Sequence, residues 1–254
     1  MDAWCRGAQQ YDLGRRCLEA ILRQPGWTVR ILTKNAAVVR DFDLLEQHRD
    51  RVLLALSLTA PVGNEELARV IEPHASPISE RMAAMRQAHE LGLRVYGMLC
   101  PLLPGVAAGA EEIEELVAFV KDCGVEQIFA EAVNSRGPGL KDTADSLREA
   151  GVTEAAQAVS RIRKGPEWSA YVAELLRNLQ FSLRRQGLLE KLRYLLYPSR
   201  CGRPTNRRSA GTMLAWFGYS GSFGNSRRNR PAGGGQLCLL KRVVGNGWFL
   251  QSGR

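Results

Sequence analysis

The sequence predicts an α/β protein built around a parallel β-sheet, and three observations carry that prediction. Helix-type and strand-type patterns alternate four times between residues 13 and 133. Residues 52–59, VLLALSLT, form a continuous apolar run, which is typical of a parallel strand covered on both faces. The connections between these patterns are short, so we expect right-handed crossovers that place helices outside the sheet.

Apolar residues recur at helical spacing in four stretches before residue 125. The first stretch is stopped by Pro25 and Gly26, and the third begins at the pair Ser76 and Pro77 and ends at Gly92. The predicted helices cover residues 13–22, 42–49, 77–92 and 113–120. The predicted strands cover residues 28–32, 52–59, 94–99 and 127–133.

A lysine stands at the end of the first predicted strand. The polar residues Thr33, Lys34 and Asn35 separate that strand from the next helix. Ligands of parallel sheets bind outside the carboxyl ends of the strands, so Lys34 lies where a βα unit presents its chemistry. A solvated loop lysine is the alternative interpretation.

Beyond residue 150 the pattern becomes helical only. One apolar stripe is formed by Val172, Leu175, Leu176 and Leu179, and a second by Leu188, Leu192, Leu195 and Leu196. We therefore divide the chain into a β/α core over residues 1–149, a helical segment over 150–200 and a basic Gly/Arg-rich tail over 201–254. The composition of this tail predicts disorder.

The net charge of +9 belongs entirely to the tail. Residues 201–254 contain nine Lys or Arg and no Asp or Glu, which leaves 26 basic against 26 acidic residues in residues 1–200. Arginine, glycine and interleaved aromatic residues are typical of arms that neutralise phosphates and stack bases, so DNA or another nucleic acid is a candidate partner. Translation of GC-rich coding sequence in a shifted frame gives a similar composition and is the alternative origin of the tail.

Several other classes of protein lack support in the sequence. No apolar run reaches the roughly 18 residues that span a bilayer, and the first residues are not those of a signal peptide, so we expect a cytoplasmic protein without a membrane partner. The six cysteines are far apart, form no C-x-x-C pair, and have no cluster of histidines beside them. No metal-ligating residue is therefore predicted.

A series of short motifs is spread in order and with natural spacing over residues 2–200. They are Asp2-Ala-Trp4, LGRRCLEA at 13–20, ILTK at 31–34, RDFDLL at 40–45, LSLT at 56–59, LARVIEP at 67–73, Glu80-Arg81, Gly92, PLLPG at 101–105 and LLYPS at 195–199. Together these motifs resemble the spore photoproduct lyase-like proteins of the radical SAM superfamily, some of which act in DNA repair.

The resemblance implies a partial (β/α)6 barrel and lyase chemistry on S-adenosylmethionine. In this family a [4Fe-4S] cluster is held by three cysteines of a C-x-x-x-C-x-x-C loop after the first strand, and the cofactor binds at its open iron. Asp2-Ala-Trp4 falls where the family has the loop after its second strand. We therefore expect the first strands and the cluster ligands to be absent from this chain, which would then be an inactive fragment, since such clusters need thiolates arranged together.

The resemblance also assigns cofactor-binding residues. It implies that Lys34 and Ser57 approach the aminocarboxylate end of S-adenosylmethionine, where an ammonium and a hydroxyl group suit a carboxylate. The alternative for Ser57 is a buried strand serine hydrogen-bonded to backbone. Thr59 and Arg81 are weaker candidates, and the alternative for Arg81 is a pair with a neighbouring carboxylate across its own helix surface. The sequence identifies no catalytic residue.

Two other functions are compatible with the same residues. In the first, the sheet is a scaffold and the basic tail makes the chain a non-catalytic nucleic-acid-binding protein. In the second, the chain is an aldolase-type enzyme in which Lys34 acts as an amine nucleophile, which requires a desolvated lysine.

Overall fold

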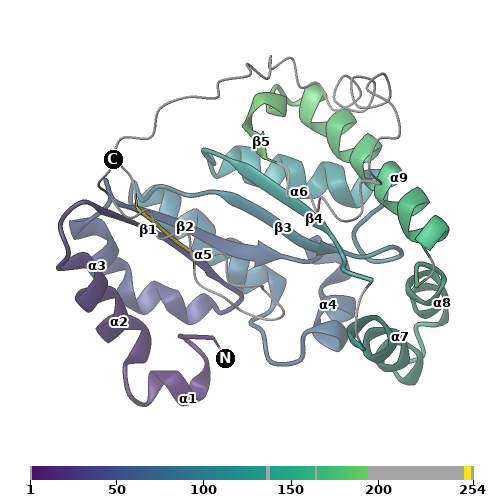
Figure 1. Cartoon of the computed structure of the whole chain (residues 1–254), viewed down its shortest axis with the longest axis horizontal. Helices are drawn as coiled ribbons and strands as arrows, with labels where there is room; N and C mark the ends of the chain where they lie inside the picture. The colour runs from purple at the N-terminus through teal and green to yellow at the C-terminus, as the bar shows by residue number, and fades with distance from the viewer. Residues whose placement is uncertain (1, 136–137, 164, 194–248, 253–254) are drawn as a thin grey trace, which may run out of the picture. The chain divides into compact units, whose positions relative to one another are not determined.

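Five parallel strands run side by side in the order in which they occur in the chain (Figure 1). The computed structural model describes residues 2–135, 138–163, 165–193 and 249–252, which all belong to one compact unit. The strands are β1 (Trp27–Thr33), β2 (Val52–Leu58), β3 (Gly97–Leu102), β4 (Ile128–Ala132) and β5 (Leu192–Arg193). A sixth strand, β6 (Phe249–Ser252), pairs antiparallel with β1 at the edge of the sheet. The predicted α/β class with a parallel sheet is confirmed.

Helices fill the connections between the parallel strands. α1 (Arg6–Gln9) and α2 (Leu13–Leu22) precede β1, and the 3-10 helix η1 (Ala36–Asp41) with α3 (Phe42–Gln47) joins β1 to β2. η2 (Val62–Asn64), α4 (Glu65–Ile71) and α5 (Ile78–Glu90) lead to β3, and α6 (Ala110–Asp122) leads to β4. α7 (Gly139–Glu149), α8 (Thr153–Arg161), α9 (Gly165–Arg185) and η3 (Leu189–Lys191) lead to β5. No helix in the described part of the chain is long and apolar enough to cross a membrane.

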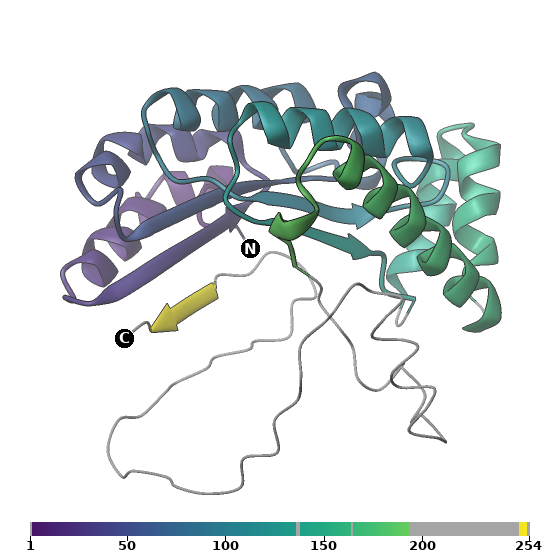
Figure 2. The same cartoon turned by 90° about the horizontal axis from the view of Figure 1, so that it is seen from above.

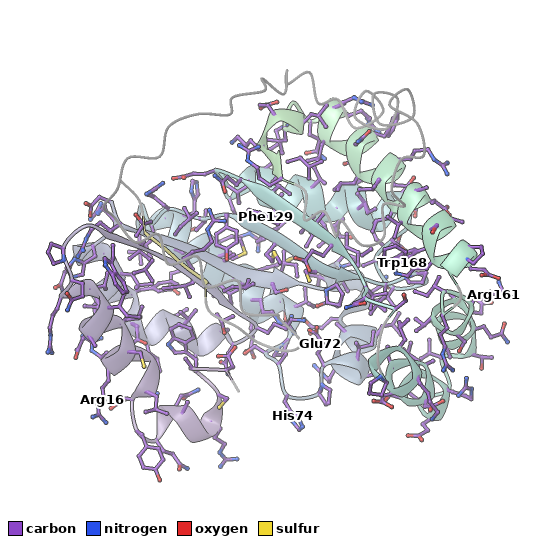
Figure 3. All side chains as sticks on the ribbon, viewed as in Figure 1. Arg16, Glu72, His74, Phe129, Arg161 and Trp168 are labelled. Atoms are coloured by element: carbon purple, nitrogen blue, oxygen red, sulfur yellow. The ribbon has the colours of Figure 1, made fainter. Side chains whose placement is uncertain are left out.

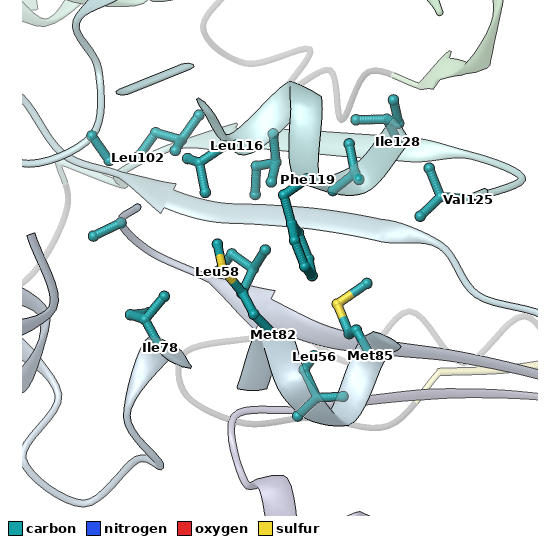
Figure 4. Packing of buried hydrophobic residues seen from close by; sticks show 14 of the residues in the cluster. Leu56, Leu58, Ile78, Met82, Met85, Leu102, Leu116, Phe119, Val125 and Ile128 are labelled. Carbon is teal, nitrogen blue, oxygen red and sulfur yellow. The ribbon is translucent and has the colours of Figure 1, made fainter. Parts of the chain in front are cut away.

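The main hydrophobic core lies between one face of the sheet and a layer of helices. Figure 2 shows α5 and α6 lying along that face. Leu56 and Leu58 of β2 face Met82 of α5, and Phe119 of α6 packs beside them in the same core (Figure 4). Because side chains of a strand alternate between faces, these apolar positions leave every second strand residue for the other side of the sheet.

The other side of the sheet, which we call the second face, carries a smaller apolar cluster formed by Leu53, Ala55, Tyr96 and Met98. Every member comes from β2, β3 or the residue just before β3, and no helix of the described segments contributes to it. The guanidinium of Arg30 lies 4.9 Å from the ring centre of Tyr96, which places a cation over an aromatic ring near the amino ends of the strands. The second face is therefore apolar along β2 and β3, with the Arg30 cation of β1 beside the cluster.

Two sequence predictions about local structure are wrong. The helical stripe expected around Leu188 and Leu192 is interrupted, because Leu192 and Arg193 pair with β4 as strand β5. An apolar segment beside an open sheet edge gains backbone hydrogen bonds as a strand, and this gain overrides the helical spacing. Ser76 does not cap α5, because the N-cap of that helix is Pro77. The Oγ of Ser76 instead accepts a hydrogen bond of 2.9 Å from the backbone N of Ala36.

Other predicted elements are confirmed with shifted bounds. The third strand begins three residues later than expected, and α4 lies between the predicted strand 52–59 and the predicted helix 77–92, where the sequence predicts no element. Gly92 and Gly124 have the positive φ angles expected of helix stops. The tail predicted over residues 201–254 lies outside the described residues, apart from residues 249–252 of β6.

Candidate functional site

Four neighbouring strands each present a polar side chain where they end. Along the second face, Leu32 is followed by Lys34, Ala55 by Ser57 and Thr59, Met98 by Cys100, and Phe129 by Glu131. Two residues from the helical layer, Glu72 and Arg81, contact this set. We call these seven residues the edge cluster. They lie at the carboxyl edge of the sheet, which is where parallel sheets bind ligands.

Glu72 is the centre of the edge cluster. It follows α4, lies between that helix and the ends of the strands (Figure 3), and its side chain is 11% exposed. Its Oε1 accepts hydrogen bonds from the Lys34 ammonium and, at 2.9 Å, from Thr59 Oγ1. Its Oε2 lies 2.9 Å from Nη2 of Arg81 in an ion pair that lacks hydrogen-bond alignment. Two cations thus share one buried carboxylate.

The charge of Glu72 is maintained by these neighbours. Burial alone would raise the pKa of Glu72, since a carboxylate loses hydration in the interior. The positive charges of Lys34 and Arg81, with the hydrogen bonds from Lys34 and Thr59, outweigh that effect and hold the pKa below its ordinary value. Glu72 is therefore an anion at neutral pH.

Arg81 fixes the position of Glu72. Its side chain is 2% exposed, and it donates from Nε to the carbonyl of Ser76 at 2.6 Å and from Nη1 to the carbonyl of Ser57 at 2.9 Å. The alternative interpretation, in which Arg81 pairs across its own helix surface, is wrong, because its carboxylate partner comes from the end of another helix. Arg81 fastens α5, the end of β2 and Glu72 to one another.

Ser57 links the ends of two strands. Its Oγ donates a hydrogen bond of 2.6 Å to the carbonyl oxygen of Cys100, and Thr59 Oγ1 lies 3.5 Å from the same oxygen. Both side chains are buried. Ser57 therefore makes the hydrogen bond to backbone that the alternative interpretation of this residue expects. The same position is where the resemblance implies a contact with the cofactor.

Cys100 and Glu131 form a second pair at the same edge. The thiol of Cys100 donates to Oε2 of Glu131 at 3.2 Å. Burial, followed by the nearby charge of Glu131, raises the pKa of the Cys100 thiol well above its ordinary value. Burial also raises the pKa of Glu131, although the thiol hydrogen bond and the charge of Lys34 oppose that shift. Lys34 therefore acts on both groups, which places all three in one electrostatic site.

The N-terminal segment reaches the same edge from outside the sheet. Oδ2 of Asp2 accepts a hydrogen bond of 2.6 Å from Thr33 Oγ1, at the last residue of β1, and lies 3.4 Å from the backbone N of Lys34. Trp4, two residues after Asp2, is held in place by a hydrogen bond of 2.7 Å from its Nε1 to Oδ2 of Asp41. These bonds fix the backbone from which Lys34 extends.

The described cysteines do not fit an iron–sulfur cluster. Cys5, Cys17, Cys100 and Cys123 are free thiols in different elements, and the described residues contain no group of three Cys, His, Asp or Glu side chains placed to hold a metal ion. A [4Fe-4S] cluster needs several thiolates around one centre. Cys201 and Cys238 lie outside the described residues.

The sequence identifies four members of the edge cluster and misses three. Lys34, Ser57, Thr59 and Arg81 are candidates from the sequence, and the structure brings them together. Glu72, Cys100 and Glu131 are added by the structure. A signal for Glu131 exists, because a carboxylate two residues after an aromatic residue in a predicted strand shares the face of that residue. Glu72 gives no such signal, since it follows α4, a helix that lies between the elements predicted from the sequence.

The chain is similar over 136 residues to curated proteins of a virus and of mycobacteria. The uncharacterized protein ORF301 of Acidianus two-tailed virus is 33% identical, over 52% of this chain and 44% of the viral protein. An uncharacterized protein of Mycobacterium tuberculosis strain H37Rv is 25% identical, over 54% of this chain and 40% of that protein. The chain thus spans less than half the length of these relatives, whose names state no activity. No protein-family model and no solved structure matches the chain.

Proposed function

We propose that the chain is part of a radical SAM protein of the spore photoproduct lyase-like type, and that its edge cluster binds the amino acid end of S-adenosylmethionine. The observation that carries the proposal is the position of Lys34 and Ser57, which end adjacent parallel strands on the same face of the sheet. The ammonium of Lys34, whose side chain is 22% exposed, is a suitable partner for a ligand carboxylate, and the bond from Ser57 to the carbonyl of Cys100 holds the neighbouring strand end in place.

The order of the strands supports the barrel part of the proposal. Strands β1 to β5 follow chain order, and α5 and α6 lie on one face (Figure 2). Among the described residues the helices α5 and α6 cover one face of the sheet, which corresponds to the wall of a partial (β/α)6 barrel whose interior would be the second face. Barrels bind their ligands at the carboxyl ends of the strands, and the edge cluster lies at those ends.

The charges of the edge cluster leave Lys34 free to exchange partners. Its side chain is 22% exposed, whereas that of Arg81 is 2% exposed. If the ammonium of Lys34 turns toward a ligand carboxylate, Glu72 keeps the ion pair with Arg81 and the hydrogen bond from Thr59. The buried carboxylate therefore stays compensated, so the exchange avoids the cost of an unpaired buried charge.

The iron–sulfur cluster of the family is not assigned to this part of the chain. When bound, such a cluster supplies the electron that cleaves S-adenosylmethionine. Because the described cysteines do not fit as its ligands, the proposal for these residues is limited to binding and orienting the cofactor.

Binding of S-adenosylmethionine tests the proposal. We expect isothermal titration calorimetry to detect binding to the chain, and Lys34→Met to weaken it by roughly 10- to 100-fold, because a hydrogen bond to a charged group contributes about 1.5–3 kcal/mol. Lys121→Met is the matched control, since Lys121 is an exposed lysine of α6. Equal affinities of the two variants, or no binding to the wild-type chain, would contradict the proposal.

We also propose a nucleic acid as a partner, on the charge distribution alone. The nine uncompensated cations of residues 201–254 should bind duplex DNA by releasing counterions. Replacing Arg207, Arg208, Arg227 and Arg228 with Gln in the full chain should reduce the slope of log K against log salt by about 0.9 for each phosphate that the variant no longer neutralises. An unchanged slope would remove the tail from any nucleic-acid function.

A further inference from the structure

We propose that residues 237–244, LCLLKRVV, form a short amphipathic helix that docks on the second face of the sheet and covers its apolar cluster. The segment lies outside the described residues, a few positions before β6. The inference goes beyond the proposed function and does not depend on S-adenosylmethionine, because it concerns the apolar cluster of the second face and not the edge cluster.

The apolar cluster is buried, although no helix of the described segments contributes to it. The exposed fractions are 4% for Leu53, 0% for Ala55, 2% for Tyr96 and 7% for Met98. Neighbouring strand residues pack beside these side chains, whereas water above them is excluded only by a second layer, and parallel sheets are covered on both faces. The helices α5 and α6 lie along the opposite face (Figure 2). The cover therefore comes from outside the described residues, of which 194–248 is the longest stretch.

Strand β6 brings the end of the chain next to the apolar cluster. It begins with Phe249, which pairs with Arg30 in the middle of β1. The guanidinium of Arg30 lies 4.9 Å from the ring centre of Tyr96, a member of the cluster. Residues 237–254 also belong to the same compact unit as the sheet. Residues 245–248 can extend over about 14 Å, or roughly three strand spacings, so the segment before them reaches the cluster on β2 and β3.

The segment has the sequence pattern of an amphipathic helix. At about 100° per residue its apolar side chains fall within an arc of about 160°. They are Leu237, Leu239, Leu240, Val243 and Val244. Lys241 and Arg242 fall on the opposite side, together with Cys238, and Gly245 follows where helices commonly stop. A strand fits less well, because each of its two faces would carry one of the cations.

The orientation of the docked helix follows from its charges. Contact between an apolar helix side and an apolar sheet face removes hydrocarbon from water on both partners. In this orientation Lys241 and Arg242 point to solvent and away from the guanidinium of Arg30, so no unpaired cation is buried. The occupant is the same chain and not a second copy, because β6 of that chain is paired with β1 and leaves a short connection to the segment.

Photo-crosslinking of the full chain locates the segment. The photoreactive residue p-benzoylphenylalanine replaces Leu240 on the predicted apolar side, and it replaces Arg242 on the predicted solvent side as the matched control. Crosslinked peptides are mapped by mass spectrometry in an equal mixture of isotopically light and heavy chains, which separates contacts within one chain from contacts between copies. The probe at Leu240 should react with residues 53–55 or 96–98 of its own chain, and the probe at Arg242 should not.

Two crosslinking results would overturn the proposal. The first is a probe at Leu240 that leaves both cluster segments unmodified or reacts with α5 and α6 instead. The second is crosslinking to the cluster mainly between light and heavy chains, because the occupant would then be a second copy.

Oxidation by hydrogen peroxide measures what the segment protects. Met98 belongs to the apolar cluster, whereas Met85 of α5 lies in the main core. In Leu240→Asp, Met98 should be oxidised at least about tenfold faster than in the wild type, since losing the burial of one leucine side chain shifts an opening equilibrium by that factor or more. Met85 should keep its rate, and Arg242→Asp should change neither methionine.

Peptide mapping gives both oxidation rates in one sample, so Met85 reports whether the variant is folded. An unchanged rate at Met98 in folded Leu240→Asp would overturn the proposal. If Met85 also reacts faster, the variant has unfolded, and the crosslinks decide, because the photoreactive residue keeps an apolar side chain at this position.

Discussion

Replacement of Arg81 by methionine is predicted to be the most destabilising single change in the edge cluster. The side chain is 2% exposed, and its removal leaves Glu72 without one ion-pair partner and the carbonyls of Ser57 and Ser76 without their donors. Removing one partner of a buried ion pair costs about 3–5 kcal/mol. For a domain of this size that loss lowers the unfolding midpoint by roughly 6–20 °C.

Urea unfolding followed by circular dichroism measures this loss, with Arg69→Met as the control. Arg69 is 56% exposed and pairs with Glu65 and Glu66 on the surface of α4, so its replacement should cost about 1 kcal/mol or less. The double variant Glu72→Gln with Arg81→Met should lose about 1–3 kcal/mol less than the sum of the single changes, since the two residues contact each other. If Arg81→Met is within about 1 kcal/mol of Arg69→Met, the buried network does not stabilise the edge.

Three further predictions concern ionisation. Because the pKa of Glu72 is lower in the folded state than its ordinary value of 4.5, its contribution to stability should be present above that value and be lost as the pH falls below it; Glu72→Gln should flatten this acid limb in urea titrations. Because the pKa of Glu131 is raised, its effect has the opposite sign, and stability is lost as the pH rises from about 4.5 through the raised value. Glu131→Gln should therefore unfold at a higher temperature than the wild type at pH 8 and at the same temperature at pH 4, and a lower midpoint at pH 8 would contradict the burial argument. Cys100 should be alkylated at least about tenfold more slowly than the exposed Cys17 at pH 8, as peptide mapping after iodoacetamide would show; equal rates would contradict its burial.

Periodicity located most of the sheet because burial repeats along a strand or helix. The run at 52–59 has few polar interruptions, and the structure places it as β2 at the centre of the sheet. Strand β5 could not be predicted in this way, because its two residues form a strand only by pairing with β4. Local spacing does not contain that long-range contact.

In the candidate site, too, some residues could be predicted from local sequence and others depend on the fold. Lys34 could be predicted because a strand end followed by a helix start has a recognisable pattern. Glu72 could not, since its role depends on the distance from a helix end to the ends of β1 and β2, which the fold alone determines. The partner of Arg81 could not be predicted for the same reason, because pairs within one helix are visible in a sequence and pairs between helices are not.

The central claim is that the carboxyl edge of the second face binds the amino acid end of S-adenosylmethionine. Backbone amide NMR of the full chain, titrated with that cofactor, tests it most directly. We predict shifts concentrated at residues 33–35, 57–60, 100–102 and 131–133, with residues at the amino ends of β1 and β2 unchanged. Shifts confined to the amino ends of the strands or to α5 and α6, with these four segments unchanged, would contradict the claim.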